Sequence, residues 1–165
     1  MSKKEELVFN SLYQQYNAMV FQMCLGFVKG YNSIASDITQ EVFIKIWNNL
    51  SRFRGTSSYK TWIYKITVNT CLEYVRKLKK HYTSLSIDVV DYNLSDETIN
   101  ESKEQNKVLY QAISKLKEID RLIIMMVLEG QGYDDISEVM GISSGNVRVK
   151  IHRIKERLKK ELSYE

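Results

Sequence analysis

The chain has 165 residues, of which 44% are hydrophobic, so it can bury the core of one ordinary domain or of two small ones. Its 24 basic and 20 acidic residues leave a formal charge of +4, a mild excess that favours an anionic partner. The longest uninterrupted apolar run, residues 122–128, is far shorter than the roughly 20 residues of a membrane helix. Composition argues against a disordered tail and against direct membrane insertion.

The amino terminus contains no apolar stretch followed by small residues, so no secretory signal is expected and a cytoplasmic location is predicted. Cys24 and Cys71 lack CxxC spacing and have no His at ligand spacing. They are therefore predicted to be buried or free thiols, with no metal site and no structural disulfide. No cofactor is expected.

Charge divides the chain into three parts. Residues 1–80 carry twelve basic and five acidic side chains, whereas residues 81–105 carry six acids against Lys103 alone. Residues 106–165 return to a small positive excess, concentrated at 146–160, where seven basic side chains accompany the single acid Glu156. The middle part is rich in Ser, Thr, Asn and Asp without helical periodicity, which predicts an extended or mobile acidic linker.

Strong helix formers dominate both flanking parts, Pro is absent, and no alternating strand pattern persists. The sequence therefore predicts an all-α fold of two small helical domains joined by the flexible acidic linker. The first domain should contain three helices. The first helix carries a stripe of apolar residues until Gly26 and Gly30 punctuate the chain: Leu7, Leu12, Tyr16, Val20 and Cys24. The second should begin near Ser36 and Asp37 and bury its own stripe: Ile38, Val42, Ile46 and Leu50.

The third helix, predicted from near Tyr59 to Lys80, places residues of graded polarity on one face: Trp62, Ile66, Asn69, Glu73 and Arg76. A core tryptophan followed by a solvated helix end explains this pattern. A second interpretation rests on aromatic residues interleaved with cations around residues 52–65, because such surfaces suit unstacked bases and their phosphates. Composition alone leaves both interpretations open.

The second domain has the spacing of a helix-turn-helix. A short amphipathic helix at residues 132–140 precedes a tight turn at Gly141, and Ser143 can cap the next helix. That helix places four residues on its apolar face, Val147, Ile151, Ile154 and Leu158, and six outward: Arg148, Lys150, His152, Arg153, Lys155 and Arg157. A basic helix fastened by its back can enter the major groove of DNA, although a solvated basic helix would have the same pattern.

Five stretches, in order, carry a resemblance to a known family: DITQEVFIKIW at 37–47, FRG at 53–55, TWIYKITVN at 61–69, GISSGNVR at 141–148 and HRIKERL at 152–158. The chain resembles the extracytoplasmic-function (ECF) sigma factors of bacterial RNA polymerase, within the sigma-70 superfamily, over almost its full length. The resemblance implies a transcription initiation factor without catalytic residues. It would bind core RNA polymerase and direct it to promoters, recognising minus-35 and minus-10 elements and promoting strand opening.

The resemblance also assigns the domains and partners. Residues 1–80 would form the region 2-like domain and residues 106–165 the region 4-like domain, with the linker 81–105 lying in a polymerase channel otherwise occupied by nucleic acid. The implied partners are core RNA polymerase, through the clamp helices of its largest subunit and its flap, promoter DNA, and an anti-sigma factor.

Site residues follow from the same resemblance. Core-polymerase binding falls on one helix: Asp37, Gln40, Glu41 and Asn48. Minus-10 binding falls on the loop and third helix: Phe53, Arg54, Tyr59, Lys60, Trp62, Asn69, Arg76, Lys77 and Lys80. Minus-35 binding falls on the last helix: Ser144, Asn146, Arg148, Lys150, His152, Arg153 and Arg157. Asn69 is the candidate for holding a flipped base, because its amide both donates and accepts hydrogen bonds.

Other classes of protein explain less. A stand-alone helix-turn-helix regulator could use the same last helix without polymerase, but residues 1–80 show neither βα alternation nor a phosphate loop. A helical RNA-binding or structural adaptor would explain the basic helices but not the recognition-type turn. An enzyme is the least supported class, because the sequence contains no Ser/His/Asp set, metal-ligand spacing or carboxylate pair.

Overall fold

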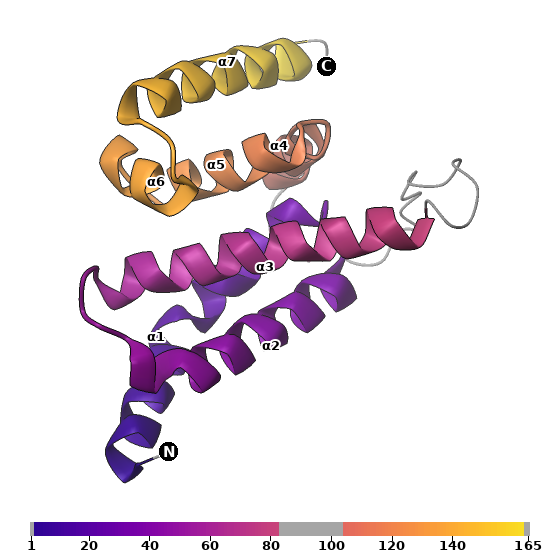
Figure 1. The fold of residues 1–165 in the computed structure, drawn as a ribbon. Helices are drawn as coiled ribbons and strands as arrows, with labels where there is room; N and C mark the ends of the chain where they lie inside the picture. The colour runs from indigo at the N-terminus through magenta and orange to yellow at the C-terminus, as the bar shows by residue number, and fades with distance from the viewer. Residues whose placement is uncertain (1, 83–103, 164–165) are drawn as a thin grey trace.

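The computed structural model describes residues 2–82 and 104–163, and within these ranges all regular structure is helical (Figure 1). Three helices form the first domain: α1 (Lys3–Phe27), α2 (Asn32–Asn49) and α3 (Tyr59–Tyr82), with a short 3-10 helix (Leu50–Arg52) after α2. Four form the second: α4 (Glu104–Ser114), α5 (Glu118–Leu128), α6 (Tyr133–Met140) and α7 (Ser144–Ser163). The predicted all-α fold is confirmed. The proposed linker, apart from its ends in α3 and α4, lies outside the described residues.

Helix α1 begins with a capping box. The Ser2 hydroxyl accepts a hydrogen bond from the Glu5 amide at 3.2 Å, and the Glu5 carboxylate accepts one from the Ser2 amide at 2.7 Å. The predicted apolar stripe is partly wrong, because Leu7 is 66% exposed near the free end of the helix. Gly26 was predicted, together with Gly30, to interrupt the first helix, but it lies inside α1. The helix ends after Phe27, where the backbone turns through a left-handed Gly30.

Helix α2 starts earlier than predicted. Its first turn closes with the hydrogen bond from the Ala35 amide to the Tyr31 carbonyl at 2.9 Å, and no side chain caps it. Ser36 and Asp37 therefore lie within the helix. A capping residue is a preference and not a requirement, so a backbone turn can begin a helix upstream of it. The predicted apolar stripe is confirmed, because all four of its members are buried: Ile38, Val42, Ile46 and Leu50.

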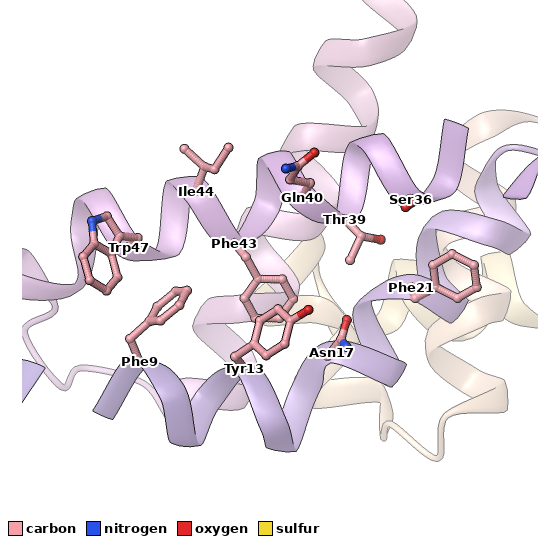
Figure 2. Close-up of a pocket in the computed structure, with 10 residues that line it drawn as sticks. All are labelled: Phe9, Tyr13, Asn17, Phe21, Ser36, Thr39, Gln40, Phe43, Ile44 and Trp47. Carbon is pink, nitrogen blue, oxygen red and sulfur yellow. The ribbon is translucent and has the colours of Figure 1, made fainter. Parts of the chain in front are cut away.

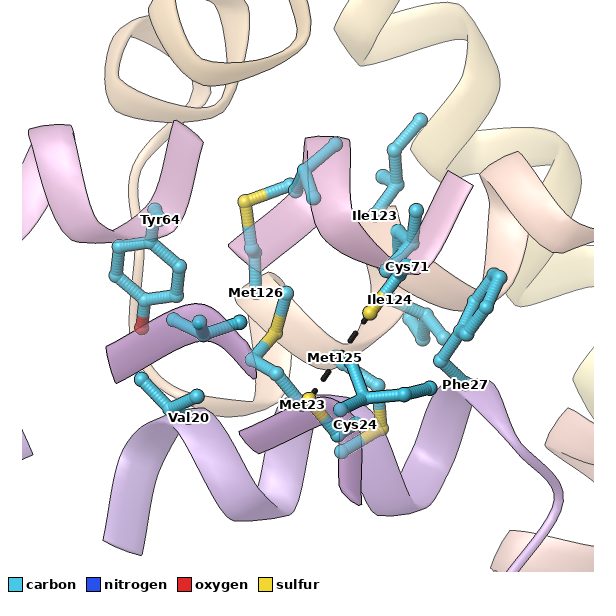
Figure 3. Packing of buried hydrophobic residues seen from close by; sticks show 14 of the residues in the cluster. Val20, Met23, Cys24, Phe27, Tyr64, Cys71, Ile123, Ile124, Met125 and Met126 are labelled. Atoms are coloured by element: carbon cyan, nitrogen blue, oxygen red, sulfur yellow. Dashed lines mark hydrogen bonds between the residues drawn. The ribbon is translucent and has the colours of Figure 1, made fainter. Parts of the chain in front are cut away.

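The cores of the two domains are continuous. Helices α1, α2 and α3 pack on one another, α4, α5 and α6 lie between that bundle and α7, and α5 rests against α1 (Figure 1). Figure 3 shows the junction, where Met23, Cys24 and Phe27 of α1 lie beside Met125 of α5. Helix α7 packs on α4, α5 and α6 of its own domain and lies on the far side from α3.

Both cysteines are free and buried, as predicted, and their sulfur atoms lie 4.0 Å apart (Figure 3). The contact with Cys24 and then burial raise the pKa of the Cys71 thiol well above its ordinary value. No group of three or more metal-binding side chains occurs in the part of the chain that the structure describes. Over the same part, every helix is too short or too polar to cross a bilayer.

Tyr64→Phe is expected to stabilise the fold. In residues 2–82 and 104–163, the Tyr64 hydroxyl is the buried side-chain polar atom that lacks a hydrogen-bond partner. A phenylalanine removes that unpaired group, so the free energy of unfolding should rise by about 1 kcal/mol in urea denaturation. The matched control is Tyr133→Phe, at a ring 42% exposed, which should change little. A loss of stability at position 64 alone would show that the hydroxyl has a partner.

Candidate nucleic-acid and partner interfaces

The outer side of α2 carries the four residues predicted to bind polymerase. Asp37, Gln40 and Asn48 are exposed and Glu41 is half-buried, while the apolar stripe fixes the opposite side of the helix in the core. Glu41 is not a free carboxylate, since Lys45 lies 3.5 Å from it and Lys77 of α3 lies 4.0 Å from it. The structure therefore brings the four residues onto one surface, in which the charge of Glu41 is partly compensated.

An apolar groove runs beside this surface, between α1 and α2 (Figure 2). Its volume is about 710 Å³, and its lining is rich in aromatic rings: Phe9, Tyr13, Asn17, Phe21, Ser36, Thr39, Gln40, Phe43, Ile44 and Trp47. Phe9 meets Trp47 edge to face at 4.9 Å between ring centroids, and Tyr13 meets Phe43 in the same way at 4.8 Å. Ile44 remains 53% exposed at the rim. The groove can therefore receive an apolar side chain from a partner.

The sequence analysis did not predict this groove, although the spacing of residues along α1 indicated one of its walls. Phe9, Tyr13, Asn17 and Phe21 recur every four residues, which puts them on one side of α1. That side is offset from the buried stripe of the helix, and only the packing of α2 beside it creates a concave surface. The spacing alone could not show which helix would lie opposite.

The aromatic residues around the start of α3 form one cluster. The rings of Phe53 and Tyr59 stack with centroids 4.4 Å apart, and the Phe53 and Trp62 centroids lie 4.9 Å apart. Ser58 fixes the entry to the helix, because its hydroxyl accepts a hydrogen bond from the Thr61 amide at 3.1 Å. All three rings are half-buried, so they offer edges and partial faces to a ligand while stacking on each other.

The cationic residues predicted for minus-10 binding extend from this cluster along α3. Arg54, Arg76, Lys77 and Lys80 are exposed and Lys60 is half-buried, while Asn69 is exposed between the aromatic cluster and the basic end. Glu73 shares this side of α3 but points to α2, where its carboxylate accepts a hydrogen bond from Lys45 at 2.6 Å. That bond lowers the pKa of Glu73. The negative charge of Glu73 is therefore compensated by Lys45, and the other charged side chains named here are basic.

Helices α6 and α7 form the predicted helix-turn-helix. The turn passes through Gly141 in the left-handed conformation at φ +68°, and the Ser143 hydroxyl accepts a hydrogen bond from the Asn146 amide at 3.2 Å. All four predicted apolar residues of α7 are buried: Val147, Ile151, Ile154 and Leu158. Five of its predicted minus-35 residues are exposed and two are half-buried, namely Ser144 and Lys150.

Arg148 has a neighbour that the sequence did not indicate. Its guanidinium carbon lies 5.2 Å from the ring centroid of Tyr133, the first residue of α6. Both side chains are exposed, so the stacked pair lies at the outer surface of the helix-turn-helix. A guanidinium stacked on a ring keeps the hydrogen-bond donors in its plane available to a ligand.

Two family profiles match separate parts of the chain. The profile described as Sigma-70 region 2 matches residues 12–81, and the one described as Sigma-70, region 4 matches residues 106–158. The ECF RNA polymerase sigma-E factor of Haemophilus influenzae is 31% identical over 170 residues, covering 96% of this chain and 89% of the relative. This chain belongs to the ECF sigma factors. The sigma-E factor of Escherichia coli K12 is 28% identical over 168 residues, covering 94% and 87%.

Solved structures share the fold. The sigma factor RpoE in complex with the anti-sigma factor NepR from Bartonella quintana superposes with a TM-score of 0.82 at 18% identity, covering 94% of this chain and 96% of that one. CnrH in complex with the cytosolic domain of CnrY gives 0.68 at 17% identity, covering 97% and 90%. As an ECF sigma factor, the protein directs RNA polymerase to promoters. Its region 2 match includes α2 and all but the last residue of α3, and its region 4 match includes α6 and α7 as far as Leu158.

Gly141→Ala should destabilise the sigma factor, because alanine is strained in the left-handed conformation at this turn. The free energy of unfolding should fall by about 1 kcal/mol, measured by denaturant titration of the full chain. Gly145→Ala is the matched control, since Gly145 has open space around its Cα and lies within α7, where alanine is favoured. Equal effects of the two substitutions would contradict the assigned turn.

Proposed function

We propose that this sigma factor docks on core RNA polymerase through the outer side of α2, opens the minus-10 element with α3, and reads the minus-35 element with α7. The observation that carries the proposal is the division of α7 into a buried apolar side and an exposed basic side. A helix held in this way can enter a major groove without losing its contact with the domain.

Docking on polymerase combines polar and apolar recognition. The acid and amide groups of Asp37, Gln40, Glu41 and Asn48 suit the basic surface of a coiled coil such as the clamp helices, where they would provide steering and register. The adjoining groove, with the exposed side chains of Ile44 and Trp47 at its rim, adds an apolar anchor point. The flap of polymerase is the proposed partner of the second domain.

The minus-10 element would be bound in its opened form. The edges of the Phe53, Tyr59 and Trp62 rings can stack against unpaired bases, and the exposed Asn69 amide can pair with the edge of a flipped base. The cations that flank them would contact the backbone: Arg54, Lys60, Arg76, Lys77 and Lys80.

The minus-35 element would be bound as a duplex. Asn146, Arg148, His152 and Arg153 are exposed in the first turns of α7, which reach base edges when a helix-turn-helix docks. Ser144, Lys150 and Arg157 would then contact phosphates. The stacking of Arg148 on Tyr133 supports a base contact for this arginine, because a pre-oriented guanidinium can form two parallel hydrogen bonds to guanine.

The same proposal covers chemistry, location and regulation. The protein would act without catalytic residues or a cofactor, in the cytoplasm where polymerase is found. The structurally similar RpoE of Bartonella quintana was solved with an anti-sigma factor, and we propose a protein of that kind as an inhibitor of this chain.

Transcription in vitro with core polymerase and a promoter library tests the function directly. We expect initiation at promoters that share minus-35 and minus-10 sequences, and no initiation from them by core enzyme alone. A stand-alone helix-turn-helix regulator would instead bind duplex DNA without polymerase and leave initiation by core enzyme unchanged.

Arg148→Ala should reduce promoter recognition by about 1 to 3 kcal/mol, because it removes a base contact of α7. Run-off transcription from promoters varied at each minus-35 position should show relaxed preference at one position. Lys155→Ala is the control, since it removes another exposed cation of the same helix that is not assigned to DNA. If both variants lower transcription uniformly across sequences, Arg148 contacts only phosphate.

Asn69→Ala should leave polymerase binding intact and impair strand opening, because the amide that would hold the flipped base is lost. Permanganate footprinting of the promoter complex measures the opened thymines, and co-purification measures polymerase binding. Asn10→Ala, at an exposed position of α1, provides the same substitution away from α3. Footprints equal to the parent's would remove Asn69 from the site.

A further inference from the structure

A small pocket lies where the end of α1 meets the start of α2, the last turns of α3 and the start of α5. Its volume is about 270 Å³, and most of its wall is apolar or aromatic: Phe27, Val28, Ile34, Tyr74, Val75 and Leu78. Charged side chains complete the wall: Lys29, Lys79, Glu118 and Arg121. None of these residues belongs to the proposed polymerase or promoter surfaces. An apolar pocket with a few charged groups is the usual form of a small-molecule site.

Close packing of α5 on α1 builds one side of this pocket. Met125 of α5 fills the space beside Gly26 of α1, where an added Cβ atom would lie 2.7 Å from its Cγ and 2.8 Å from its Cε (Figure 3). Because no side chain separates the two helices at Gly26, Arg121 of α5 comes close to Phe27 of α1. The guanidinium carbon of Arg121 lies 5.3 Å from the Phe27 ring centroid, and both side chains line the pocket.

Arg121 is a buried cation without a paired anion. Its side chain is 7% exposed, its Nε donates a hydrogen bond to the Phe27 carbonyl at 2.9 Å, and its Nη1 donates to the Leu116 carbonyl. In the part of the chain that the structure describes, no carboxylate forms an ion pair with it, and its Nη2 group has no hydrogen-bond partner. A buried charge is costly unless it is paired. The two Nη2 donors are therefore available to an anion in the pocket.

The pKa of Arg121 agrees with this description. Burial lowers the pKa of the guanidinium, and the charge of Glu118 opposes that shift. Loss of water is thus the larger of the two effects on Arg121. An anion bound in the pocket would supply the charge that the protein itself does not place beside the guanidinium.

Lys29 brings a second cation to the pocket. The residue is half-buried, and among residues 2–82 and 104–163 its ammonium group has neither an ion-pair nor a hydrogen-bond partner. Its backbone is left-handed at φ +59°, a conformation that glycine adopts more readily than lysine. The backbone therefore gains nothing from a lysine at this position. What the side chain adds is a positive charge at the pocket wall.

The other two charged residues compensate each other. Lys79 lies 3.5 Å from Glu118, and both side chains are more than a third exposed. Their charges cancel, which leaves Lys29 and Arg121 to attract an anion. Because the Glu118 carboxylate also lines the pocket, a ligand with one negative charge is favoured over a ligand with two.

The size and lining of the pocket restrict the rest of the ligand. A volume of about 270 Å³ has room for roughly nine groups of the size of a water molecule, at about 30 Å³ each. A carboxylate with an apolar tail of about seven carbon atoms has this size. The apolar wall would cover the tail, and each methylene group removed from water favours binding.

We propose that this pocket binds a small amphipathic carboxylate. The carboxylate would accept hydrogen bonds from Nη2 of Arg121 and from the Lys29 ammonium group, and the tail would lie against Ile34, Val75 and Leu78. Such a ligand touches residues of α1, α2, α3 and α5, so its binding stabilises the folded chain by mass action. The site does not depend on the proposed surfaces for polymerase and DNA.

Octanoate is the probe for this site. Titration of the full chain with sodium octanoate, below the concentration at which it forms micelles, should produce saturable shifts of the amide resonances of residues 27–30 and 74–79 in nuclear magnetic resonance spectra. Octanamide has the same tail and no charge, so it should bind about ten-fold more weakly. Equal binding of octanamide and octanoate would overturn the anion site. The absence of saturable shifts with octanoate would overturn the whole proposal.

Substitutions at Lys29 separate ligand binding from the stability of the fold. Lys29→Gly removes the cation and suits the left-handed backbone. It should weaken octanoate binding about five-fold or more, while the urea midpoint of the free chain stays equal or rises. Lys29→Arg keeps the charge and should keep most of the affinity. Unchanged affinity in Lys29→Gly would contradict the role of this residue in holding the carboxylate.

A second pair of variants tests the place of binding. Leu78→Trp fills the pocket and should abolish octanoate binding, with circular dichroism to establish that the variant is folded. Ile44→Gln is the matched control, because Ile44 lines the groove between α1 and α2, which is the other apolar surface that a fatty tail could enter. Octanoate affinity should not change in this control. Loss of binding in Ile44→Gln together with full binding in Leu78→Trp would place the ligand in the groove and overturn the proposal.

Discussion

The proposed binding surfaces of this sigma factor depend on burial of an apolar stripe on the opposite side of each helix that carries them. In α7, Val147, Ile151, Ile154 and Leu158 are buried, and the basic side chains are left outward. In α2, the buried stripe leaves acids and amides outward. Because the hydrophobic effect has no direction, the spacing of the apolar residues alone decides which side of each helix is free. Charge then decides what that free side can bind.

Electrostatic contacts connect surfaces that serve different partners. Lys45 of α2 bonds to Glu73 of α3 at 2.6 Å and lies 3.5 Å from Glu41, so the proposed polymerase surface and the proposed minus-10 surface share one lysine. These side chains are partly exposed, so the contacts contribute modestly to stability. The Lys45–Glu73 contact joins α2 to α3.

The two domains meet mainly through buried apolar side chains. Each domain has its own set of packed helices, yet α5 completes its burial only against α1. The apolar area that a chain of this size can bury is small, and the interface between the domains adds to it. The structures of the two related proteins, each solved with a bound partner, adopt the same overall fold.

The sequence by itself determined the helical class, the buried stripes of α2 and α7, the turn at Gly141 and its following cap, because each follows from residues close together in the chain. It predicted the start of α2 too late in the chain, because the ends of helices depend weakly on local preference. It also assigned Leu7 to the apolar stripe of α1, although this side chain is exposed near the helix end. Only the tertiary structure decided the groove between α1 and α2, the Lys45–Glu73 bond and the fit of Met125 at Gly26. These features join residues distant in sequence, and spacing along one helix cannot say which helix will lie opposite.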